Sequence, residues 1–501
     1  MDDSVINPLT EEQDISELLQ IRRDKLQKLQ DEGRDPFAET KFSRTAFSTE
    51  VRDRFDEMEG GDVAMAGRVM AKREMGKAIF VDIHDDKGRI QLYVKLNDVG
   101  EQAFNDVKKG DIGDIIGITG FVFKTKMGEI SVHCKTVAIL AKSLRPLPEK
   151  YHGLTNQELK YRRRYADLIM NPETRKAFEL RSAFIRHVRE FLDGRGYLEV
   201  ETPVLNTISG GATARPFITH HNTLGLDMYL RIALELHLKR LIVGGIERVY
   251  EIGRVFRNEG MSTKHNPEFT MVELYEAYTD YHGMMDIVEE LLSSAAEKLL
   301  GGYVLSWHGE EIDLTPGWQR ASMAELVKQY TGVDFMSFES VEDSVKAAAG
   351  IDVKMREGKE PSWGDLLYEC FDQRVEENLV QPVFVTDHPV EVSPLAKRKK
   401  SDPRLTDRFE LFICRNEMAN AFSELNDPID QKQRFLRQAA LRTSGDQEAG
   451  MMDDDYIEAL EYGMPPAGGM GIGIDRCVMM LTNNASIRDV LLFPTMKPME
   501  F

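Results

Sequence analysis

Apolar residues recur with helical spacing near the start of the chain. Within the segment 12–33, five of them return at intervals close to the helical repeat: Ile15, Leu18, Leu19, Leu26 and Leu29. Gly33 and Pro36 then end the run. The spacing predicts one amphipathic helix. Its polar face fits either a solvated surface or a contact with an RNA backbone, since it carries four basic residues: Arg22, Arg23, Lys25 and Lys28.

The pattern changes to short β-rich runs over residues 63–145. Runs of this kind lie at 63–69, 78–84, 89–95, 115–123 and 129–134, and turn sequences such as Asp86-Lys87-Gly88 separate them. Several short strands in one segment of this length predict a small all-β barrel. The order of the runs and the hairpin turn resemble an OB-fold.

The remaining pattern predicts a large α+β unit. Strand-like and helical runs are mixed over residues 173–501 without a steady β-α-β-α alternation, which argues against a parallel doubly wound sheet. An antiparallel sheet with helices around it fits better, and residues 284–375 read as a mostly helical insertion. The predicted organisation is therefore an N-terminal helix and extension at 1–62, the barrel at 63–145, a linker at 146–172 and the large unit at 173–501.

Composition narrows the class of protein. The 501 residues include 64 Lys and Arg against 84 Asp and Glu, a net charge of −20, whereas proteins that coat nucleic acid nonspecifically are usually basic. No apolar run approaches the roughly 20 residues that cross a bilayer, and the segment after Met1 does not resemble a signal peptide. We therefore expect a cytoplasmic protein with no membrane partner. Zinc is not expected, because the cysteines lie far apart: Cys134, Cys370, Cys414 and Cys477.

The first segment with chemical character is a predicted hairpin. A strand-like run at 248–257 enters it, Gly260 and Pro267 bracket a long turn, and a second run at 269–278 leaves it. Because side chains alternate along a strand, Phe269, Glu273 and Tyr275 are expected on one face. Arg257 and Glu259 are likewise expected to share a face of the incoming strand. Carboxylates, an arginine and aromatic rings on one face indicate a site rather than a plain core.

A glycine-rich segment follows near the C-terminus, Gly469-Met470-Gly471-Ile472-Gly473-Ile474-Asp475-Arg476. It departs from the dinucleotide-binding spacing because Ile474 stands where the third glycine would be. It is also not a P-loop, since no Gly-Lys-Ser/Thr follows. What remains predicts a close approach of backbone to ligand and, at Arg476, an arginine at a helix start that can reach phosphate oxygens.

The third segment pairs Arg408–Phe412 with a run at 417–424. Asn420, Phe422 and Glu424 share a strand face, whereas Glu417 is out of parity, so we expect a bulge between Glu417 and Asn420. Glu410 and Glu417 are hard oxygen ligands of the type that Mg²⁺ prefers.

Taken together, these segments resemble the three motifs of class II aminoacyl-tRNA synthetases. Motif 1 resembles Gly196 to Pro203, motif 2 resembles Phe256 to Phe269, and motif 3 resembles Gly469 to Arg476. Within that class the chain is similar to the bacterial-type lysyl-tRNA synthetases, nearly residue for residue over 257–275, 422–427 and 471–476. The resemblance extends over almost the whole chain. It implies an antiparallel class II catalytic domain preceded by an anticodon-binding OB-fold.

The resemblance also implies a reaction and its residues. Lysine and ATP form lysyl adenylate, and the lysyl group passes to the 3′ end of tRNA(Lys). Arg257 would bridge the lysine carboxylate and the α-phosphate, and Arg476 would hold the γ-phosphate. Glu410 and Glu417 would hold Mg²⁺, with up to three ions bound alongside ATP. The other nucleotide contacts would be Glu259, His265, Asn266 and Phe269.

The implied amino-acid pocket binds two ammonium groups. Gly211 and Glu235 would lie at the α-amino group, whereas the ε-ammonium and the stem would meet Glu273, Tyr275, Asn420, Phe422 and Glu424. An aspartyl or asparaginyl relative would need cations there instead. Two neighbours depart from the family: Leu234 stands where proline is expected, and Ala421 where many relatives carry glycine. Both stand next to pocket residues, and neither departure removes a charged group.

In the barrel, Phe80, Gln91 and Glu129 match the anticodon-reading positions of the family. From periodicity alone, a core strand residue is the favoured interpretation of Phe80. His220 and His221 suggest local structure rather than a metal site, since no third ligand stands at a suitable spacing.

The class II resemblance further implies a homodimer through motif 1. Three other functions stay open at this point. The chain could lysylate a protein, synthesise diadenosine tetraphosphate as a side activity, or bind RNA without catalysis. The complete barrel argues against the first, and the intact set of Arg257, Glu259, Glu410, Glu417 and Arg476 argues against the last.

Overall fold

The structure is a computed structural model that describes residues 8–148, 156–338, 340–354, 361–443 and 448–498. It divides the chain into two compact units, Met1–Leu154 and Thr155–Phe501, and the boundary falls inside the predicted linker. Each unit has a hydrophobic core of its own.

The first unit is built on a closed barrel with the strand order β1-β2-β3-β5-β4. Ile79, Val81 and Leu92 point into its core, because every second side chain of a strand faces the same side. The predicted turn Asp86-Lys87-Gly88 connects β2 to β3. The strands are β1 (Asp62–Met75), β2 (Ala78–His84), β3 (Arg89–Lys95), β4 (Ile115–Lys124) and β5 (Ile130–Ala141).

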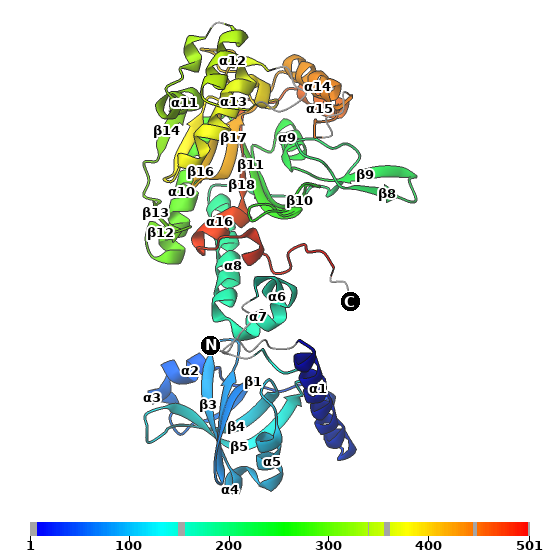
Figure 1. Ribbon diagram of the computed structural model, residues 1–501, viewed down its shortest axis with the longest axis vertical. Coiled ribbons are helices and arrows are strands. Elements are labelled where there is room, and N and C mark those ends of the chain that lie inside the picture. Colours follow the sequence, from blue (N-terminus) through cyan, green and yellow to red (C-terminus); the bar gives the residue numbers. More distant parts are fainter. Residues whose placement is uncertain (1–7, 149–155, 339, 355–360, 444–447, 499–501) are drawn as a thin grey trace. The chain divides into compact units, whose positions relative to one another are not determined.

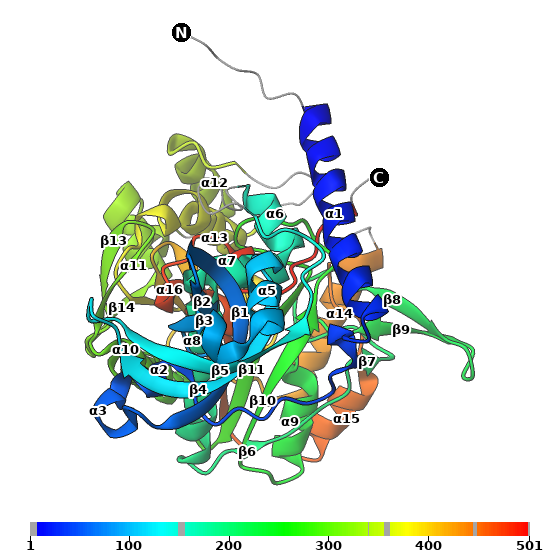
Figure 2. The ribbon, with the colours of Figure 1, turned by 90° about the horizontal axis from the view of Figure 1, so that it is seen from below.

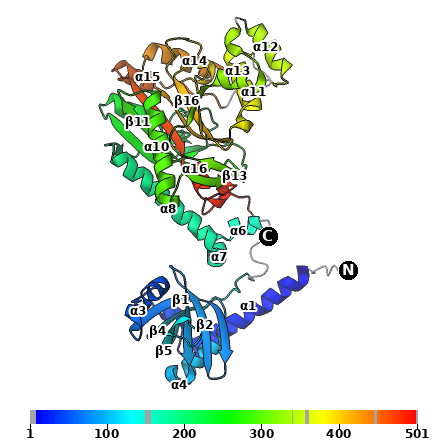
Figure 3. The same cartoon turned by 90° about the vertical axis from the view of Figure 1, so that its left-hand side faces the viewer.

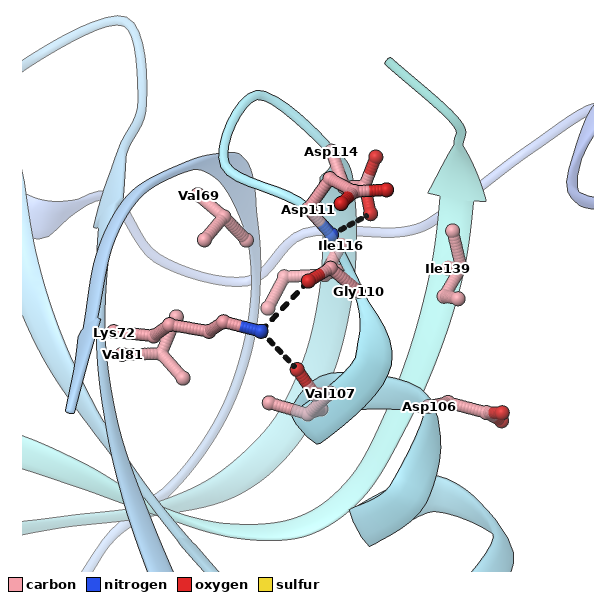
Figure 4. Close-up of a pocket in the computed structure, with 10 residues that line it drawn as sticks. All are labelled: Val69, Lys72, Val81, Asp106, Val107, Gly110, Asp111, Asp114, Ile116 and Ile139. Carbon is pink, nitrogen blue, oxygen red and sulfur yellow. Dashed lines mark hydrogen bonds between the residues drawn. The ribbon is translucent and has the colours of Figure 1, made fainter. Parts of the chain in front are cut away.

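Short helices and one long helix accompany the barrel. The long helix, α1, lies beside it (Figures 1 and 3). The helices are α1 (Pro8–Asp31), η1 (Pro36–Ala38), α2 (Ser48–Asp53), α3 (Phe55–Met58), α4 (Leu96–Val99) and α5 (Glu101–Lys109). A small pocket lies at the end of α5, where the Lys72 ammonium donates to the carbonyl of Gly110 at 2.7 Å (Figure 4). This contact satisfies a C-terminal carbonyl of the helix, which accounts for the lysine structurally.

One basic residue of α1 does not belong to the exposed face that the sequence predicted. Arg22 is buried and donates to the carbonyls of Ser143 at 2.8 Å and Ile112 at 3.2 Å. Lys25 forms an ion pair with Asp111 at 2.6 Å. These contacts fasten α1 to the barrel, and of the four predicted basic residues Arg23 and Lys28 remain exposed.

The second unit contains an eight-stranded sheet with the order β14-β15-β16-β17-β18-β11-β10-β6. Its inner pairings are antiparallel, as predicted, and the two outermost pairings are parallel. The strands are β6 (Leu198–Glu199), β10 (Arg248–Phe256), β11 (Glu268–Ala277), β14 (Gln319–Ser322), β15 (Val383–Thr386), β16 (Arg408–Ile413), β17 (Asn416–Ser423) and β18 (Ala467–Gly473).

Helices cover both faces of this sheet (Figure 1). On one face, α8 (Pro172–Asp193), α10 (Tyr281–Leu300) and α16 (Ile474–Leu481) bury the largest apolar core. On the other, α9 (Glu235–Val243), α14 (Pro428–Thr443) and α15 (Asp454–Glu461) form a second core with β10 and β11. A hairpin of β8 (Ile218–His221) and β9 (Leu226–Leu230) extends away from the sheet (Figures 1 and 2), and β7 (Leu205–Asn206) pairs with β9.

Two predicted segments contain elements that the sequence did not indicate. The described part of the linker is helical, with α6 (Gln157–Arg162) and α7 (Arg164–Met170), and Arg164 is buried in an ion pair with Asp167 at 2.6 Å. The described part of the insertion at 284–375 is mostly helical, as predicted, but it also contains strands: β12 (Val304–Trp307) and β13 (Glu310–Asp313) bury Trp307 and Ile312, and β14 joins the main sheet. Its helices beyond α10 are α11 (Met323–Thr331), η2 (Phe335–Ser337), α12 (Val341–Gly350) and α13 (Trp363–Arg374).

Three further short helices complete the described part of the second unit: η3 (Glu376–Asn378), η4 (Val390–Val392) and η5 (Ile487–Asp489). Among the described residues, no helix combines the length and the apolarity required to span a bilayer.

Candidate active site

Strand alternation separates core side chains from site side chains in the sheet of the second unit. On β11, Val272 and Leu274 enter the core under α8, α10 and α16. Glu273 and Tyr275 therefore point to the opposite face, where the Tyr275 hydroxyl donates to Glu273 Oε2 at 3.0 Å. The predicted shared face of the outgoing strand of the hairpin is confirmed by this contact.

The strand β17, which is separated from β11 by β18 in the sheet, repeats the arrangement. Ala419 and Ala421 belong to the core, so Asn420 and Phe422 face the same side as Glu273. Glu424, directly after β17, is fully buried. The predicted bulge between Glu417 and Asn420 is confirmed, because the pairing with β16 shifts between Leu411 and Phe412.

Ala421, which stands between two pocket residues in the sequence, does not face the pocket. Its side chain is buried in the core beneath the sheet, on the face opposite Asn420 and Phe422. Having alanine there in place of glycine therefore adds a methyl group to the core and none to the pocket.

The glycine-rich segment forms the strand β18 between β11 and β17. Its glycines make room for side chains of neighbouring strands: a Cβ on Gly469 would overlap Glu424 and Tyr275, and one on Gly471 would lie 2.9 Å from Met271 Cε. On the face that carries the buried carboxylates, β18 therefore presents only glycine backbone. The close approach of this backbone to a ligand stays a prediction.

Three buried carboxylates meet above this glycine backbone. Glu235, Glu273 and Glu424 are all at least nine-tenths buried. Lys239, four residues after Glu235 on α9, is fully buried and forms ion pairs with both Glu235 and Glu424. Both oxygens of Glu424 lack a regular hydrogen bond from any described residue, so the ion pair leaves them with accepting capacity. Burial raises the pKa of Glu235 and of Glu424, and Lys239 opposes that rise.

The pKa of Glu273 is raised into the neutral range. Burial, together with repulsion from Glu235, raises its pKa to about 7. Two hydrogen bonds to the carboxylate limit the rise, one from Tyr275 and one from the backbone N–H of Leu234 at 2.9 Å. A proline at position 234 would have no N–H to donate, so the departure from the expected proline gives Glu273 an additional donor.

Gly211 lies beside this cluster in a left-handed conformation with φ of 89°. A Cβ there would lie 3.1 Å from Ala233 Cβ and 3.5 Å from Glu235 Cβ. Both the backbone angle and the space therefore require glycine.

The candidate nucleotide residues gather at the other end of the same face. The Arg257 guanidinium lies 5.2 Å from the centre of the Phe269 ring. Arg476, in the first turn of α16, donates to the backbone carbonyl of Glu417 at 2.5 Å and lies 3.5 Å from His265 Nε2. Burial lowers the pKa of Arg257, with Glu259 and Glu417 opposing the shift.

The incoming strand of the hairpin is shorter than the sequence predicts. β10 ends at Phe256, so Arg257 and Glu259 do not share a strand face, and Glu259 is exposed in the loop that follows. The loop conformation arises because Arg257 N bonds to Pro267 O, after which the chain leaves the ladder. Asn266 is buried and donates to the carbonyl of Glu268 at 2.7 Å, so its amide braces the loop.

The two candidate magnesium ligands are held by arginines. Glu410 pairs with Arg408 at 2.6 Å, and Arg408 also donates to Asn420 Oδ1 at 3.1 Å. Glu417 pairs with Arg476 at 3.4 Å. Nearby, burial raises the pKa of Glu376 to about 7, and Asp372, Glu410 and Glu417 add to the rise. Carboxylate oxygens are the donor type that a hard divalent cation takes beside phosphate oxygens, but the described residues contain no cluster of three or more Asp, Glu, His or Cys side chains that could hold a metal ion.

Lys239 and Arg408 are site residues that the sequence interpretation missed. The available signals were spacing alone: Glu235 and Lys239 stand four apart on a helix, and Arg408 and Glu410 stand two apart on a strand. Neither spacing is specific by itself.

In the first unit, the three candidate anticodon residues lie on the outer face of the barrel. Phe80 is half-buried and points away from the core positions Ile79 and Val81, so the alternative of a core residue is wrong. Asp82 pairs with Gln91 in the ladder, which places Gln91 on the same face as Phe80. Glu129 precedes β5 and forms an ion pair with Arg89 at 3.1 Å.

Phe80 begins a stripe of rings that the sequence interpretation did not list. Its ring centre lies 5.1 Å from that of Tyr93, and Tyr93 in turn contacts Phe123 and His133. Phe121 stacks on His133 at 4.8 Å. Half-buried rings on an OB-type barrel are the usual platform for unpaired bases.

His220 and His221 make local contacts. His220 lies 2.8 Å from Asp227 across the β8–β9 hairpin, and His221 accepts from the backbone N–H of Leu224 at 3.2 Å.

Comparison with known proteins agrees with this geometry. Residues 156–497 match the family model described as "tRNA synthetases class II (D, K and N)", and residues 63–140 match "OB-fold nucleic acid binding domain". The first match covers more than half of the chain. The sheet, its hairpin and its glycine-rich strand thus define a class II tRNA synthetase catalytic unit.

Similar proteins narrow the class. The chain is 58% identical over 489 residues to the lysine–tRNA ligase of Pelotomaculum thermopropionicum, covering 98% of this chain and 96% of that protein. It is 56% identical to that of Thermoanaerobacter pseudethanolicus, covering 97% of each, and 57% identical to that of Carboxydothermus hydrogenoformans, covering 97% and 99%. The chain belongs to the lysine–tRNA ligase family. The resemblance drawn from the three motifs is confirmed, and the aspartyl or asparaginyl alternative is not favoured.

Proposed function

We propose that this site activates L-lysine with ATP and passes the lysyl group to the 3′ end of tRNA(Lys). The observation that carries the proposal is the cluster of three buried carboxylates, Glu235, Glu273 and Glu424. Buried carboxylates are costly unless cations pair with them, and a free lysine brings two ammonium groups. A pocket for aspartate or asparagine would have no use for this arrangement.

Glu235 with Gly211 receives the α-ammonium of lysine, while Glu273, Tyr275 and Glu424 receive the ε-ammonium. Asn420 and Phe422 line the aliphatic stem. The substrate carboxylate then lies toward Arg257, since the amino groups are held at the carboxylate cluster. Fixing both ends of lysine aligns its carboxylate with the α-phosphorus of ATP.

In the first step, a carboxylate oxygen of lysine attacks the α-phosphorus. The bond from that phosphorus to the bridging oxygen breaks, and pyrophosphate leaves. Arg257 stabilises the charge that develops on the α-phosphate, and Arg476 holds the γ-phosphate, because preorganised cations act most strongly in a buried site. Phe269 stacks on the adenine, and Glu259, His265 and Asn266 complete the nucleotide contacts.

In the second step, a terminal ribose hydroxyl of the tRNA attacks the carbonyl carbon of the adenylate. The mixed anhydride bond breaks, AMP leaves, and the ester forms. Glu410 and Glu417 would hold Mg²⁺, which supplies Lewis-acid charge neutralisation at the phosphates when it is bound. The two arginines that pair with these carboxylates, Arg408 and Arg476, keep them ordered.

We also propose the partners of the reaction. The ring stripe that begins at Phe80, together with Gln91 and Glu129, reads the anticodon. A homodimer forms through the motif-1 segment, Gly196 to Pro203. The four cysteines are free and buried, which suits the reducing cytosol.

Lysine-dependent exchange between ATP and pyrophosphate tests the first step directly. We expect exchange with lysine and none with aspartate or asparagine. Charging of tRNA(Lys) transcripts tests the second step. Exchange that depends on aspartate, or no exchange with any amino acid in the presence of Mg²⁺, would overturn the proposal.

A further inference from the structure

The amino-acid pocket already contains an ammonium group that belongs to the protein. Lys239 on α9 is fully buried, and its Nζ contacts both Glu235 and Glu424. The same atom lies 5.1 Å from the centre of the Phe422 ring and 6.0 Å from that of Tyr275. The side chains around this ammonium are therefore those proposed to surround the ammonium groups of the substrate.

Charge counting gives Lys239 a specific role. When ionised, Glu235, Glu273 and Glu424 carry three negative charges, and Lys239 contributes one positive charge. Two further cations act on these carboxylates: Arg408, which is paired with Glu410 at 2.6 Å, and Arg257, which is proposed to bind the substrate carboxylate. The pocket is left with two negative charges, which equals the number of ammonium groups on lysine.

Lys239 also joins the two ends of the pocket. Glu235 lies at the start of α9, whereas Glu424 follows β17 on the sheet. A single ammonium that forms ion pairs with both carboxylates holds the helix start next to the strand end. Two carboxylates brought this close without a cation would repel each other, and one of them would take up a proton.

We propose that Lys239 is a positioning residue for lysine recognition: it holds Glu235 and Glu424 in place and neutralises one of three pocket carboxylates, so that two negative charges remain for the two ammonium groups of the substrate. This inference rests on the proposed function. It adds a residue that does not touch the reacting atoms but sets the charge of the site that holds them.

The first test is Lys239→Met, which keeps the aliphatic stem and removes the cation. In lysine-dependent pyrophosphate exchange, we expect the KM for lysine to rise by roughly two to three and a half powers of ten, as for loss of one partner of a buried pair. The KM for ATP should change by less than about twofold, because Lys239 contacts no candidate nucleotide residue. A lysine KM like the parent's, or equal rises in both KM values, would overturn the inference.

A double-variant cycle separates charge setting from general support. Glu424→Gln leaves one net negative charge, whereas Glu424→Gln with Lys239→Met restores two. We therefore expect the double variant to bind lysine at least as well as Glu424→Gln alone. Multiplication of the two single effects would show that Lys239 is only a structural support. The double variant also removes a carboxylate together with its cation, so it remains informative if Lys239→Met fails to fold.

Lys142→Met is the matched control. Lys142 is another buried lysine, paired with Asp111 and Asp114 in the barrel unit. It should lower the temperature of unfolding without moving the lysine KM. If the parent itself shows no lysine-dependent exchange, the proposed function fails. If the parent is active and Lys239→Met matches it, only the inference about Lys239 fails.

Discussion

The carboxylates of the pocket show how one residue type takes different roles through its surroundings. Glu410 and Glu417 face arginines, whereas Glu235 and Glu424 share one lysine. Glu273 contacts no cation among the described residues and relies on two hydrogen bonds. The three carboxylates around Lys239 therefore carry more negative charge than the protein itself neutralises. An amino acid with two ammonium groups gains the most binding free energy there.

Glu424→Gln tests the lysine assignment at this scale. It keeps the shape of the side chain and removes the charge that would face the ε-ammonium. Leaving a buried charge without its partner costs about 3–5 kcal/mol, so the lysine KM should rise by roughly two to three and a half powers of ten. ATP binding should change little. Norleucine lacks the ε-ammonium, so the variant should prefer lysine over norleucine less strongly than the parent does. A loss that falls on ATP instead would show that the pocket is placed wrongly.

Leu234→Pro tests the protonation of Glu273. The pKa of Glu273 is about 7 in the free protein, so lysine binding needs the proton to leave, and the lysine KM should rise as the pH falls from about 8 to about 6. Proline removes the N–H that stabilises the ionised form, which raises this pKa further. The rise in KM should therefore begin at higher pH than in the parent.

Leu234→Ala is the control, because it also loses the leucine side chain but keeps the N–H. Identical pH profiles for the two variants would argue against the hydrogen bond as the cause.

The raised pKa of Glu273 also affects the stability of the fold. It lies above the ordinary value of 4.5, so the contribution of neutral Glu273 to folding is full below about pH 4.5 and is lost as the pH rises through about 7. Added lysine should offset that loss.

At the scale of elements, the sequence predicts what depends on alternation along one strand and misses what depends on packing between elements. Alternation along β11 and β17 places Glu273, Tyr275, Asn420 and Phe422 on one face, and period-two reasoning recovers this. The same reasoning predicts the bulge after Glu417, since Glu417 and Asn420 differ in parity. It cannot place Lys239, because that contact depends on how α9 packs against the end of β17. Nor can it find β14, a short run within a helical segment that is held by pairing with β15.

The barrel offers a test that separates its role from that of the sheet. Phe80→Ala should weaken charging of tRNA(Lys) by about 1–3 kcal/mol, the value of one stacked base. Lysine-dependent pyrophosphate exchange should remain close to the parent's, since the adenylate residues all belong to the second unit. Phe37→Ala, an exposed phenylalanine outside the barrel strands, is the control and should affect neither activity. Equal loss of both activities in Phe80→Ala would identify Phe80 as a folding residue.

At the scale of the whole molecule, the sequence predicted two units with different patterns, and the structure divides the chain inside the predicted linker. Pro146 and Pro148 correctly indicated a boundary between the units. They gave no sign of α6 and α7, which follow them in the chain. Arg164 and Asp167 of α7 form a buried ion pair, and such burial cannot be predicted from the local sequence. The net charge of −20 leaves nucleic-acid binding to local features. The ring stripe on the barrel, with Arg73 5.4 Å from the Phe80 ring, is such a feature.

Exposed apolar side chains at motif 1 favour the assembly of two copies of the chain. Motif 1 ends the sheet with the two-residue strand β6, whose Leu198 is 52% exposed, and two more exposed apolar side chains directly follow motif 1 in the chain: Val204 at 40% and Leu205 at 42%. Exposed apolar groups beside an open strand edge favour association, and a two-fold interface would cover both copies at once. We expect a dimeric mass by sedimentation velocity at micromolar concentration. Leu198→Arg should shift it toward the monomer and reduce pyrophosphate exchange, whereas Leu300→Arg, an exposed leucine at the end of α10, should change neither. A monomeric parent with full activity would exclude motif 1 as an obligate interface.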